Sequence, residues 1–212
     1  MGKLILKMSM SVDGFVADAD GGASWIFNRP DDKAVAWTVE TISKAGIHIM
    51  GSRTFRDMAS WWPTSTQPFA PAMNLIPKAV FSKSGTAILT AGDTTKTLED
   101  ATRHSAATDR SAELQPGAES WARSQVMCGD LATDIATLKG QMDKPVLAHG
   151  GAGFARSLAA AGLIDEFHLL VHPIALGKGL ALFADLAAPI PFNLLSSTRF
   201  PGGAVAQVYG RS

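Results

Sequence analysis

The chain has 212 residues, of which 46% are hydrophobic and 18% are charged, a size and composition that favour one folded domain over residues 1–212. Nineteen basic residues balance nineteen acidic ones, which argues against a nucleic-acid or anionic-membrane partner held by bulk charge. The single cysteine, Cys128, excludes an internal disulfide and a cysteine-based zinc cage, and we expect no metal site. The apolar run 4–10 is interrupted by Lys7 and is too short for a signal sequence or a membrane span, so we expect a cytoplasmic protein.

Strand and helix signals alternate along the first part of the chain. The first strand runs into Asp13-Gly14, a pair typical of turns. The first helix follows a capping aspartate, and the second begins directly after a strand. The predicted elements are a strand at 3–12, a helix from Asp31 or Asp32 to Gly46, a strand at 47–50, a helix from Gly51 to Trp62 and a strand at 78–82.

Residues 91–124 lose this periodicity and are rich in Thr, Ser, Ala, Asp and Glu. A structureless loop of that length is unusual in a compact domain, so we interpret the segment as an irregular excursion with a strand or two of its own, without a domain boundary.

Regular strand and helix patterns resume after residue 124. The predicted elements are a strand at 125–128, a helix capped by Asp130, a strand at 145–148, a helix from the glycines at 150–153 to Gly162, a strand at 166–172 and a hairpin of 193–200 with 204–209.

The alternating order predicts an α/β domain with a mostly parallel central sheet flanked by helices, to which the C-terminal hairpin adds antiparallel strands. In such sheets, ligands bind beyond the carboxyl ends of the strands. Candidate functional residues are therefore those that directly follow each predicted strand.

The most informative segment runs from a buried strand through His149 and consecutive glycines into a helix. Glycines allow close backbone approach to a ligand, and the helix N-terminus attracts a phosphate. A tight turn that needs small residues for packing explains the pattern equally well. It is not the standard dinucleotide fingerprint, because Arg156 stands where the third glycine belongs. The candidate phosphate contacts are Gly150, Gly151, Ala152, Gly153 and Phe154.

Two further candidates also follow strands. Arg53 offers a fork of donors suited to a phosphate, although an ordinary helix cap with a solvated arginine is the alternative, and Lys83 alone is a weak signal. Asp13 could touch a ligand or only shape a turn, and Trp25 lies in a glycine- and serine-rich loop where packing explains it less easily. The residues of the two post-strand sites are Gly51, Ser52, Arg53 and Thr54, and then Ser82 and Lys83.

The run Met-Ser-Val-Asp-Gly-Phe-Val-Ala at 10–17 resembles the opening strand and loop of the dihydrofolate-reductase superfamily, in particular the branch of the reductase domain of bacterial riboflavin biosynthesis. The other motifs of that branch follow in the same order, and together they cover nearly the whole chain apart from 91–120. These motifs are Gly-Ser-Arg-Thr-Phe at 51–55, Lys-Ala-Val-Phe-Ser at 78–82, His-Gly-Gly-Ala at 149–152, Gly-Leu-Ile-Asp-Glu-Phe at 162–167 and His-Pro-Ile-Ala-Leu-Gly-Lys-Gly at 172–179.

This resemblance implies NADPH binding across the carboxyl ends of the sheet. The glycine run would meet the pyrophosphate, Arg53 the phosphates including the 2′-phosphate, and Trp25 the nicotinamide. Many relatives carry a basic residue where this chain has Ser52. Carried over position by position, the expected cofactor contacts are Trp25, Gly51, Ser52, Arg53, Thr54, Ser82, Lys83, Gly150, Gly151, Ala152, Gly153 and Phe154.

The resemblance also implies hydride transfer to a small pterin- or pyrimidine-like heterocycle, bound between Asp13, Trp25, the helix 31–45 and His149. Riboflavin-pathway reductases have an acidic residue where this chain has His149. Our hypothesis is that His149, with an ordinary pKa near 6.5, delivers or organises the proton, and that Asp13 is a second catalytic candidate.

Two alternatives stay open. The chain could be the reductase of 5-amino-6-(5-phosphoribosylamino)uracil in riboflavin biosynthesis, or a dinucleotide-binding module without turnover. The resemblance further implies a homodimer.

Overall fold

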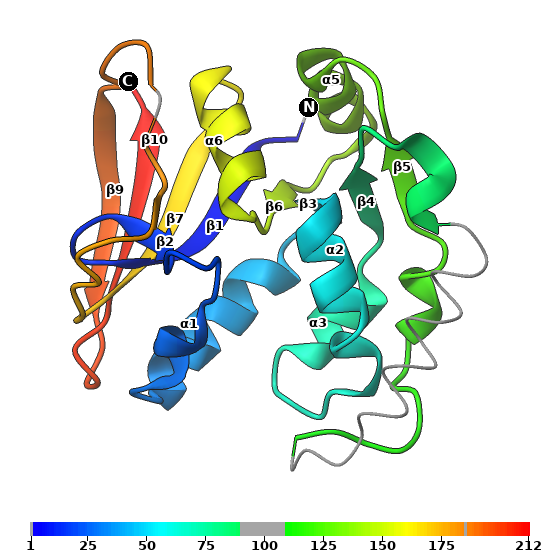
Figure 1. Ribbon diagram of the computed structural model, residues 1–212, viewed down its shortest axis with the longest axis horizontal. Helices are drawn as coiled ribbons and strands as arrows, with labels where there is room; N and C mark the ends of the chain where they lie inside the picture. The colour runs from blue at the N-terminus through cyan, green and yellow to red at the C-terminus, as the bar shows by residue number, and fades with distance from the viewer. Residues whose placement is uncertain (1, 90–108, 185) are drawn as a thin grey trace.

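Eight strands of the described residues form one sheet, in the order β5-β4-β3-β6-β1-β7-β10-β9 (Figure 1). The computed structural model describes residues 2–89, 109–184 and 186–212. The strands are β1 (Leu4–Ser11), β3 (Ile47–Gly51), β4 (Lys78–Phe81), β5 (Gln125–Met127), β6 (Val146–Ala148), β7 (Glu166–His172), β9 (Phe192–Arg199) and β10 (Val205–Arg211). A second, small antiparallel sheet pairs β2 (Phe15–Ala17) with β8 (Leu180–Ala181).

The sheet is parallel from β5 to β7 and ends in an antiparallel hairpin. β1 pairs in parallel with both β6 and β7, and β3 does so with β6 and β4. β10 runs antiparallel to β7 and to β9. The predicted α/β architecture with C-terminal antiparallel strands is confirmed.

Helices cover both faces of the parallel part. Because successive strand residues face opposite sides, Leu4 and Leu6 of β1 pack in one core cluster with Leu138 and Leu158, whereas Ile5 packs in the other with Ile42. The helices are α1 (Asp32–Ser43), α2 (Ser52–Ala59), α3 (Ala70–Leu75), α5 (Leu131–Gln141) and α6 (Ala152–Ala160). None of the helices described is both long and apolar enough to cross a membrane.

The boundaries differ from the predictions where prolines and short segments interrupt the pattern. α2 ends at Ala59, and Pro63 lies within a separate 3-10 turn (Trp62–Thr64). α3 was not predicted, because it is six residues long and carries Pro71 in its first turn, which leaves too little sequence for a helical stripe.

The described part of the excursion, residues 109–124, contains no strand and only one isolated bridge, between Ser65 and Arg110. The expected strands are therefore absent there, and the rest of that prediction falls on 90–108, outside the described residues. The segment is held instead by a buried side chain. Trp121 is fully buried, its ring lies 5.8 Å from that of Phe55, and its Nε1 donates to Asn74 Oδ1 at 2.8 Å.

Candidate functional site

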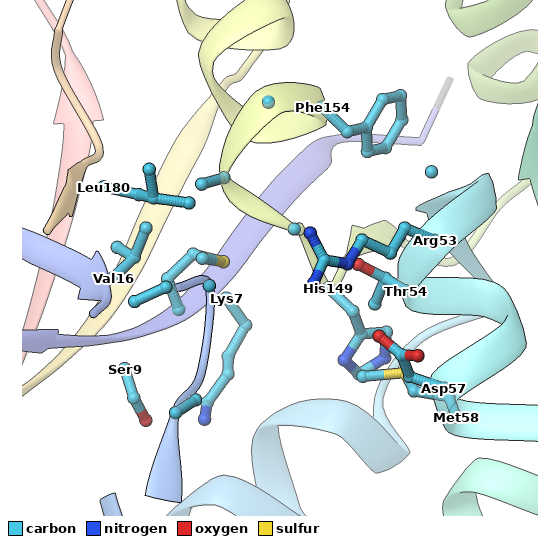
Figure 2. Close-up of a pocket in the computed structure, with 18 of the residues that line it drawn as sticks. Lys7, Ser9, Val16, Arg53, Thr54, Asp57, Met58, His149, Phe154 and Leu180 are labelled. Carbon is cyan, nitrogen blue, oxygen red and sulfur yellow. The ribbon is translucent and has the colours of Figure 1, made fainter. Parts of the chain in front are cut away.

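A cavity of about 580 Å³ opens at the carboxyl ends of β1, β3 and β6, where the first turns of α2 and α6 meet (Figure 2). The segment around η1 (Ser24–Phe27) forms another wall. The lining residues come from β1 (Lys7, Met8, Ser9), the β2 region (Val16, Ala17, Gly21, Ala23, Ile26), the end of β3 (Gly51), α2 (Ser52, Arg53, Thr54, Asp57, Met58), the turn between β6 and α6 (His149, Gly151), α6 (Ala152, Gly153, Phe154) and β8 (Leu180).

The glycines before α6 are required by close packing. Gly150 has φ of +88°, and a Cβ there would lie 2.7 Å from Met8 Sδ. A Cβ on Gly151 would lie 3.0 Å from Thr54 Oγ1. The backbone of this turn therefore lies too close to β1 and α2 to leave room for a side chain at Gly150 or Gly151. This packing places the start of α6 at the cavity.

α2 and α6 both begin at glycines, Gly51 and Gly151, with no side chain bonded to the N–H groups of the first turn. Two other helices of the same chain, α1 and α5, begin at Asp31 and Asp130, whose carboxylates accept from those groups. An uncapped helix start leaves N–H donors and the positive end of the helix dipole to an external anion. Two such starts face one cavity here.

Side chains of α2 line the cavity beside these two helix starts. Thr54 and Arg53 line the cavity, and the Arg53 guanidinium lies against Gly21, where an added Cβ would be 3.5 Å from both of its terminal nitrogens. Ser52 also lines the cavity and donates through Oγ to the Phe81 carbonyl at 3.1 Å. The predicted residues 51–54 and 151–154 are thus brought together in one wall, whereas Gly150 lies just behind it.

The floor of the cavity contains a lysine that sequence reasoning treated only as a break in an apolar run. Lys7 is half-buried in β1, and burial lowers the pKa of its ammonium to about 8. Within the described residues, no hydrogen-bond acceptor or carboxylate partners that ammonium. A lone charge inside an otherwise uncharged, largely buried strand is the signal that could have identified it, because burying a charge without a partner is costly.

His149 lines the same cavity, but its electrostatics differ from the expectation. Burial, and to a smaller extent the electrostatic effect of the neighbouring His48, Lys7 and Lys78, holds the pKa of His149 well below its ordinary value of 6.5. The imidazole is therefore neutral at physiological pH. It can donate or accept a hydrogen bond, but it does not supply a proton from an imidazolium.

Asp13 does not line the cavity. It is exposed, accepts from Ser11 Oγ at 2.6 Å and receives the backbone N–H groups of Leu176 and Gly177 at 3.1 and 2.7 Å. These bonds, first that from Ser11, lower the pKa of Asp13. The structure thus places the Asp13 carboxylate as an anchor for the 173–179 loop, where it does not face the cavity as a catalytic group would.

Trp25 lies in η1 and is buried, whereas its neighbours Ala23 and Ile26 line the cavity. Its ring meets the edge of His172 at 5.6 Å between centroids, so it supports that wall from behind. Ser82 is buried and Lys83 exposed, and both stand outside the cavity beyond the start of α2. These three positions were expected to contact the cofactor.

Sequence reasoning also missed Ser9, Asp57 and Met58, which line the cavity. Asp57 is the one carboxylate among the described residues of its lining. No group of three or more histidine, cysteine or acidic side chains in the described part of the chain is arranged to hold a metal ion.

The sheet order with its C-terminal hairpin is accompanied by a dihydrofolate-reductase-like fold. Dihydrofolate reductase from Enterococcus faecalis, complexed with NADP(H), superposes with a TM-score of 0.58 at 13% identity over all of this chain and 97% of that one. The model of the RibD C-terminal domain family matches residues 2–206, so the chain belongs to that family.

Individual relatives span this chain fully. The uncharacterized protein YyaP of Bacillus subtilis (strain 168) is 24% identical over 208 residues, 98% of this chain and 94% of YyaP. A Shewanella sp. PV-4 protein whose name refers to riboflavin biosynthesis has a TM-score of 0.68 at 22% identity, over 100% of this chain and 99% of that one. A Thermotoga maritima diaminohydroxyphosphoribosylaminopyrimidine deaminase/5-amino-6-(5-phosphoribosylamino)uracil reductase has a TM-score of 0.64 at 16% identity, and this chain covers 57% of it.

Proposed function

We propose that this protein is an NADPH-dependent reductase that transfers a hydride to a small pterin- or pyrimidine-like heterocycle. The observation that carries the proposal is the meeting of two uncapped helix starts, at Gly51 and Gly151, with the half-buried Lys7 in one cavity. The first feature suits a phosphorylated cofactor and the second a polar substrate. Membership of the RibD C-terminal domain family supports a reductase. A cytoplasmic location is part of the proposal.

The residues present fit a dinucleotide phosphate. A Cβ on Gly51 would lie 3.2 Å from Phe154 Cβ, so the two helix starts are packed together and their free N–H groups converge. Thr54 and Arg53 add a hydroxyl and a guanidinium to the same wall, and a guanidinium binds phosphate through two parallel hydrogen bonds. We assign the pyrophosphate to the starts of α2 and α6, and the 2′-phosphate to Arg53.

When bound, NADPH supplies a hydride, and the chain must orient the substrate, exclude water and provide a proton. Val16, Leu180 and Phe154 give the cavity apolar walls, which limit water near the reacting atoms. Lys7 fits the acid role better than His149, because a pKa of about 8 leaves its ammonium charged at neutral pH and more acidic than an ordinary lysine. We therefore assign the proton to Lys7 Nζ and a hydrogen-bonding role to His149.

The riboflavin-pathway uracil reductase is the alternative within this class, and the Thermotoga enzyme's name supports it. A dinucleotide-binding module without turnover is the alternative of another class. The lysine without a partner in the cavity floor favours an enzyme, because a module that only bound the cofactor would have no use for a buried ammonium that destabilises the fold.

Turnover tests the proposal. Purified protein is incubated with 4-deuterated NADPH and a panel of oxidised pyrimidine and pterin compounds, including the phosphoribosylaminouracil substrate, and products are analysed by mass spectrometry. We expect enzyme-dependent transfer of deuterium to one class of compound in the panel, and transfer slowed by about 100-fold or more in Lys7→Met. NADPH binding without transfer to any compound of the panel would favour the non-catalytic module. Rescue of a uracil-reductase-deficient riboflavin auxotroph would favour the pathway enzyme.

A further inference from the structure

The buried His48 lies against His149, which is half-buried and lines the cavity. The rings of His48 and His149 lie 4.6 Å apart between centroids, with an angle of 79° between their planes. His48 on β3 pairs with Leu147 of β6, so His149, two residues further on, lies on the same face of the sheet. His48 is fully buried, whereas His149 lines the cavity. The proposed mechanism does not use His48.

The hydrogen bonds of His48 fix the position of its proton. Its Nε2 lies 3.0 Å from the Ile42 carbonyl oxygen, and a carbonyl only accepts, so Nε2 carries the hydrogen. Burial lowers the pKa of His48 to about 4, and its ring is neutral at physiological pH. The second nitrogen, Nδ1, is therefore a lone pair, and it is buried without a protein partner.

His149 also has a ring nitrogen that lacks a hydrogen-bond partner. Its Nε2 is also buried without a protein partner, and its neutral ring carries one N–H and one lone pair. Buried polar atoms in folded proteins are normally hydrogen-bonded. The two nitrogens make no hydrogen bond to each other in the structure, but because His48 has only a lone pair to offer, a direct bond between them requires the hydrogen of His149 to be on Nε2. The hydrogen bond made by one ring nitrogen sets the role of the other.

We propose that His48 is a positioning residue that holds His149 as its Nε2–H tautomer, by accepting a direct hydrogen bond from His149 Nε2 after a small rotation of the two rings, so that the Nδ1 lone pair of His149 accepts a hydrogen bond in the cavity. Lys7 donates in the same cavity. A donor beside an acceptor matches the edge of a cyclic amide, in which a carbonyl adjoins an N–H. This substrate class rests on the proposed function, whereas the tautomer of His149 does not.

The tautomers can be measured without any ligand. In protein labelled with ¹⁵N at histidine, the ring nitrogen shifts distinguish Nδ1–H from Nε2–H rings. At pH 7.5 we expect both His48 and His149 as Nε2–H tautomers. A hydrogen on Nδ1 of His149, or an even mixture of the two forms, would overturn the proposal.

Two substitutions of His48 separate positioning from simple packing. His48→Asn places an acceptor oxygen near the position of Nδ1 but loses the bond to Ile42, whereas His48→Gln retains a donor near Nε2 and loses the acceptor. We expect His149 to stay Nε2–H in His48→Asn and to become a mixture of tautomers in His48→Gln. The same tautomer ratio in both variants would show that His48 only fills space, and a single folded variant still gives a comparison with the native protein.

The ligand edge is tested with two probes, 5,6-diaminouracil and its 1,3-dimethyl derivative, added to protein saturated with NADP⁺ in a calorimeter. The native protein and His48→Asn should bind the dimethyl compound at least about tenfold more weakly, since it lacks the amide N–H, and His48→Gln should lose this preference. Equal binding of the probes, or binding of neither, would overturn the cyclic-amide assignment. Failure of the proposed function would instead appear as absence of NADPH binding, with the histidine tautomers unchanged.

Discussion

Lys7 and His149 occupy adjacent positions on neighbouring parallel strands. Leu6 pairs with Ala148 in the register of β1 with β6, so the next residue of each segment brings an ammonium and an imidazole to one cavity floor. Only the ammonium is charged at neutral pH, because burial lowers the pKa of Lys7 to about 8 but that of His149 well below 6.5. This pair therefore offers one acid and one neutral hydrogen-bonding ring.

Lys7→Met should abolish turnover and stabilise the fold. Loss of a general acid lowers the rate by about 100-fold or more, while NADPH affinity stays within about threefold because the cofactor phosphates are assigned to the starts of α2 and α6 and to Arg53. Since the folded-state pKa of Lys7 is below the ordinary 10.5, the charged form costs stability below pH 8, and removing it should add roughly 1–3 kcal/mol to the free energy of unfolding. Urea unfolding at pH 7 and NADPH consumption measure the two effects.

Lys44→Met is the matched control, because Lys44 is exposed and forms a surface ion pair with Glu40 on α1. It should change neither quantity noticeably. A loss of stability in Lys7→Met would contradict the assignment of a destabilising buried charge.

The pH dependence of kcat/KM should reflect Lys7. Lys7 is protonated below its pKa of about 8, so the rate should decline as the pH rises through that value. Lys78 also has a lowered pKa, about 7, but its ammonium stands over the Trp121 ring, away from the cavity. In Lys7→Arg the guanidinium stays charged over the whole measured range, so the overall rate should fall because arginine does not release its proton, and the remaining rate should show no alkaline decline. Its persistence in this variant would assign the decline to another group.

Gly150→Ala should disturb both the fold and cofactor binding. The positive φ and the approach of Met8 Sδ to 2.7 Å of the added Cβ should cost about 1–3 kcal/mol and displace the start of α6. Gly140→Ala is the control, since nothing lies within 4 Å of its added Cβ and the change favours helix α5 by about 0.5–1 kcal/mol. Denaturant unfolding should give opposite signs for the two variants. Equal effects would contradict the packing described for Gly150.

We expect a homodimer that forms through β9. This strand ends the sheet beside β10 (Figure 1), and Leu194 and Leu195 are each 56% exposed. Its residues carry no charge before Arg199, whereas lone edge strands usually carry charges that prevent pairing. Light scattering should give twice the 22.3 kDa of the chain.

Leu194→Lys should reduce the measured mass to that of one chain, while Leu75→Lys, which also replaces an exposed leucine, should not. A native mass of 22.3 kDa would refute the dimer.

The strand-helix alternation predicted the architecture because each signal is local: turn pairs, capping aspartates and a period of two or 3.6 residues. The same reasoning located Arg53, Thr54 and the turn before α6, since residues that follow parallel strands must meet at one edge of the sheet. The two uncapped helix starts are visible in the sequence as glycines where α1 and α5 have aspartates.

The cavity floor could not be predicted in the same way. The strand order joins segments that are far apart in the chain. It therefore determines the neighbours of Lys7 and brings His48 against His149. Asp13 and Trp25 were expected at the ligand from the resemblance, but their surroundings are set by the 173–179 loop and by His172, which local patterns do not reveal.

The most direct test of the account is titration of the protein with NADPH and NADH, followed by quenching of its five tryptophans. We expect micromolar binding of NADPH, binding of NADH weaker by about tenfold or more because one phosphate contact is lost, and loss of that preference in Arg53→Ala but not in Arg56→Ala, on the same helix but outside the cavity lining. Binding of neither nucleotide would contradict the account, because the two helix starts would then serve a different anion.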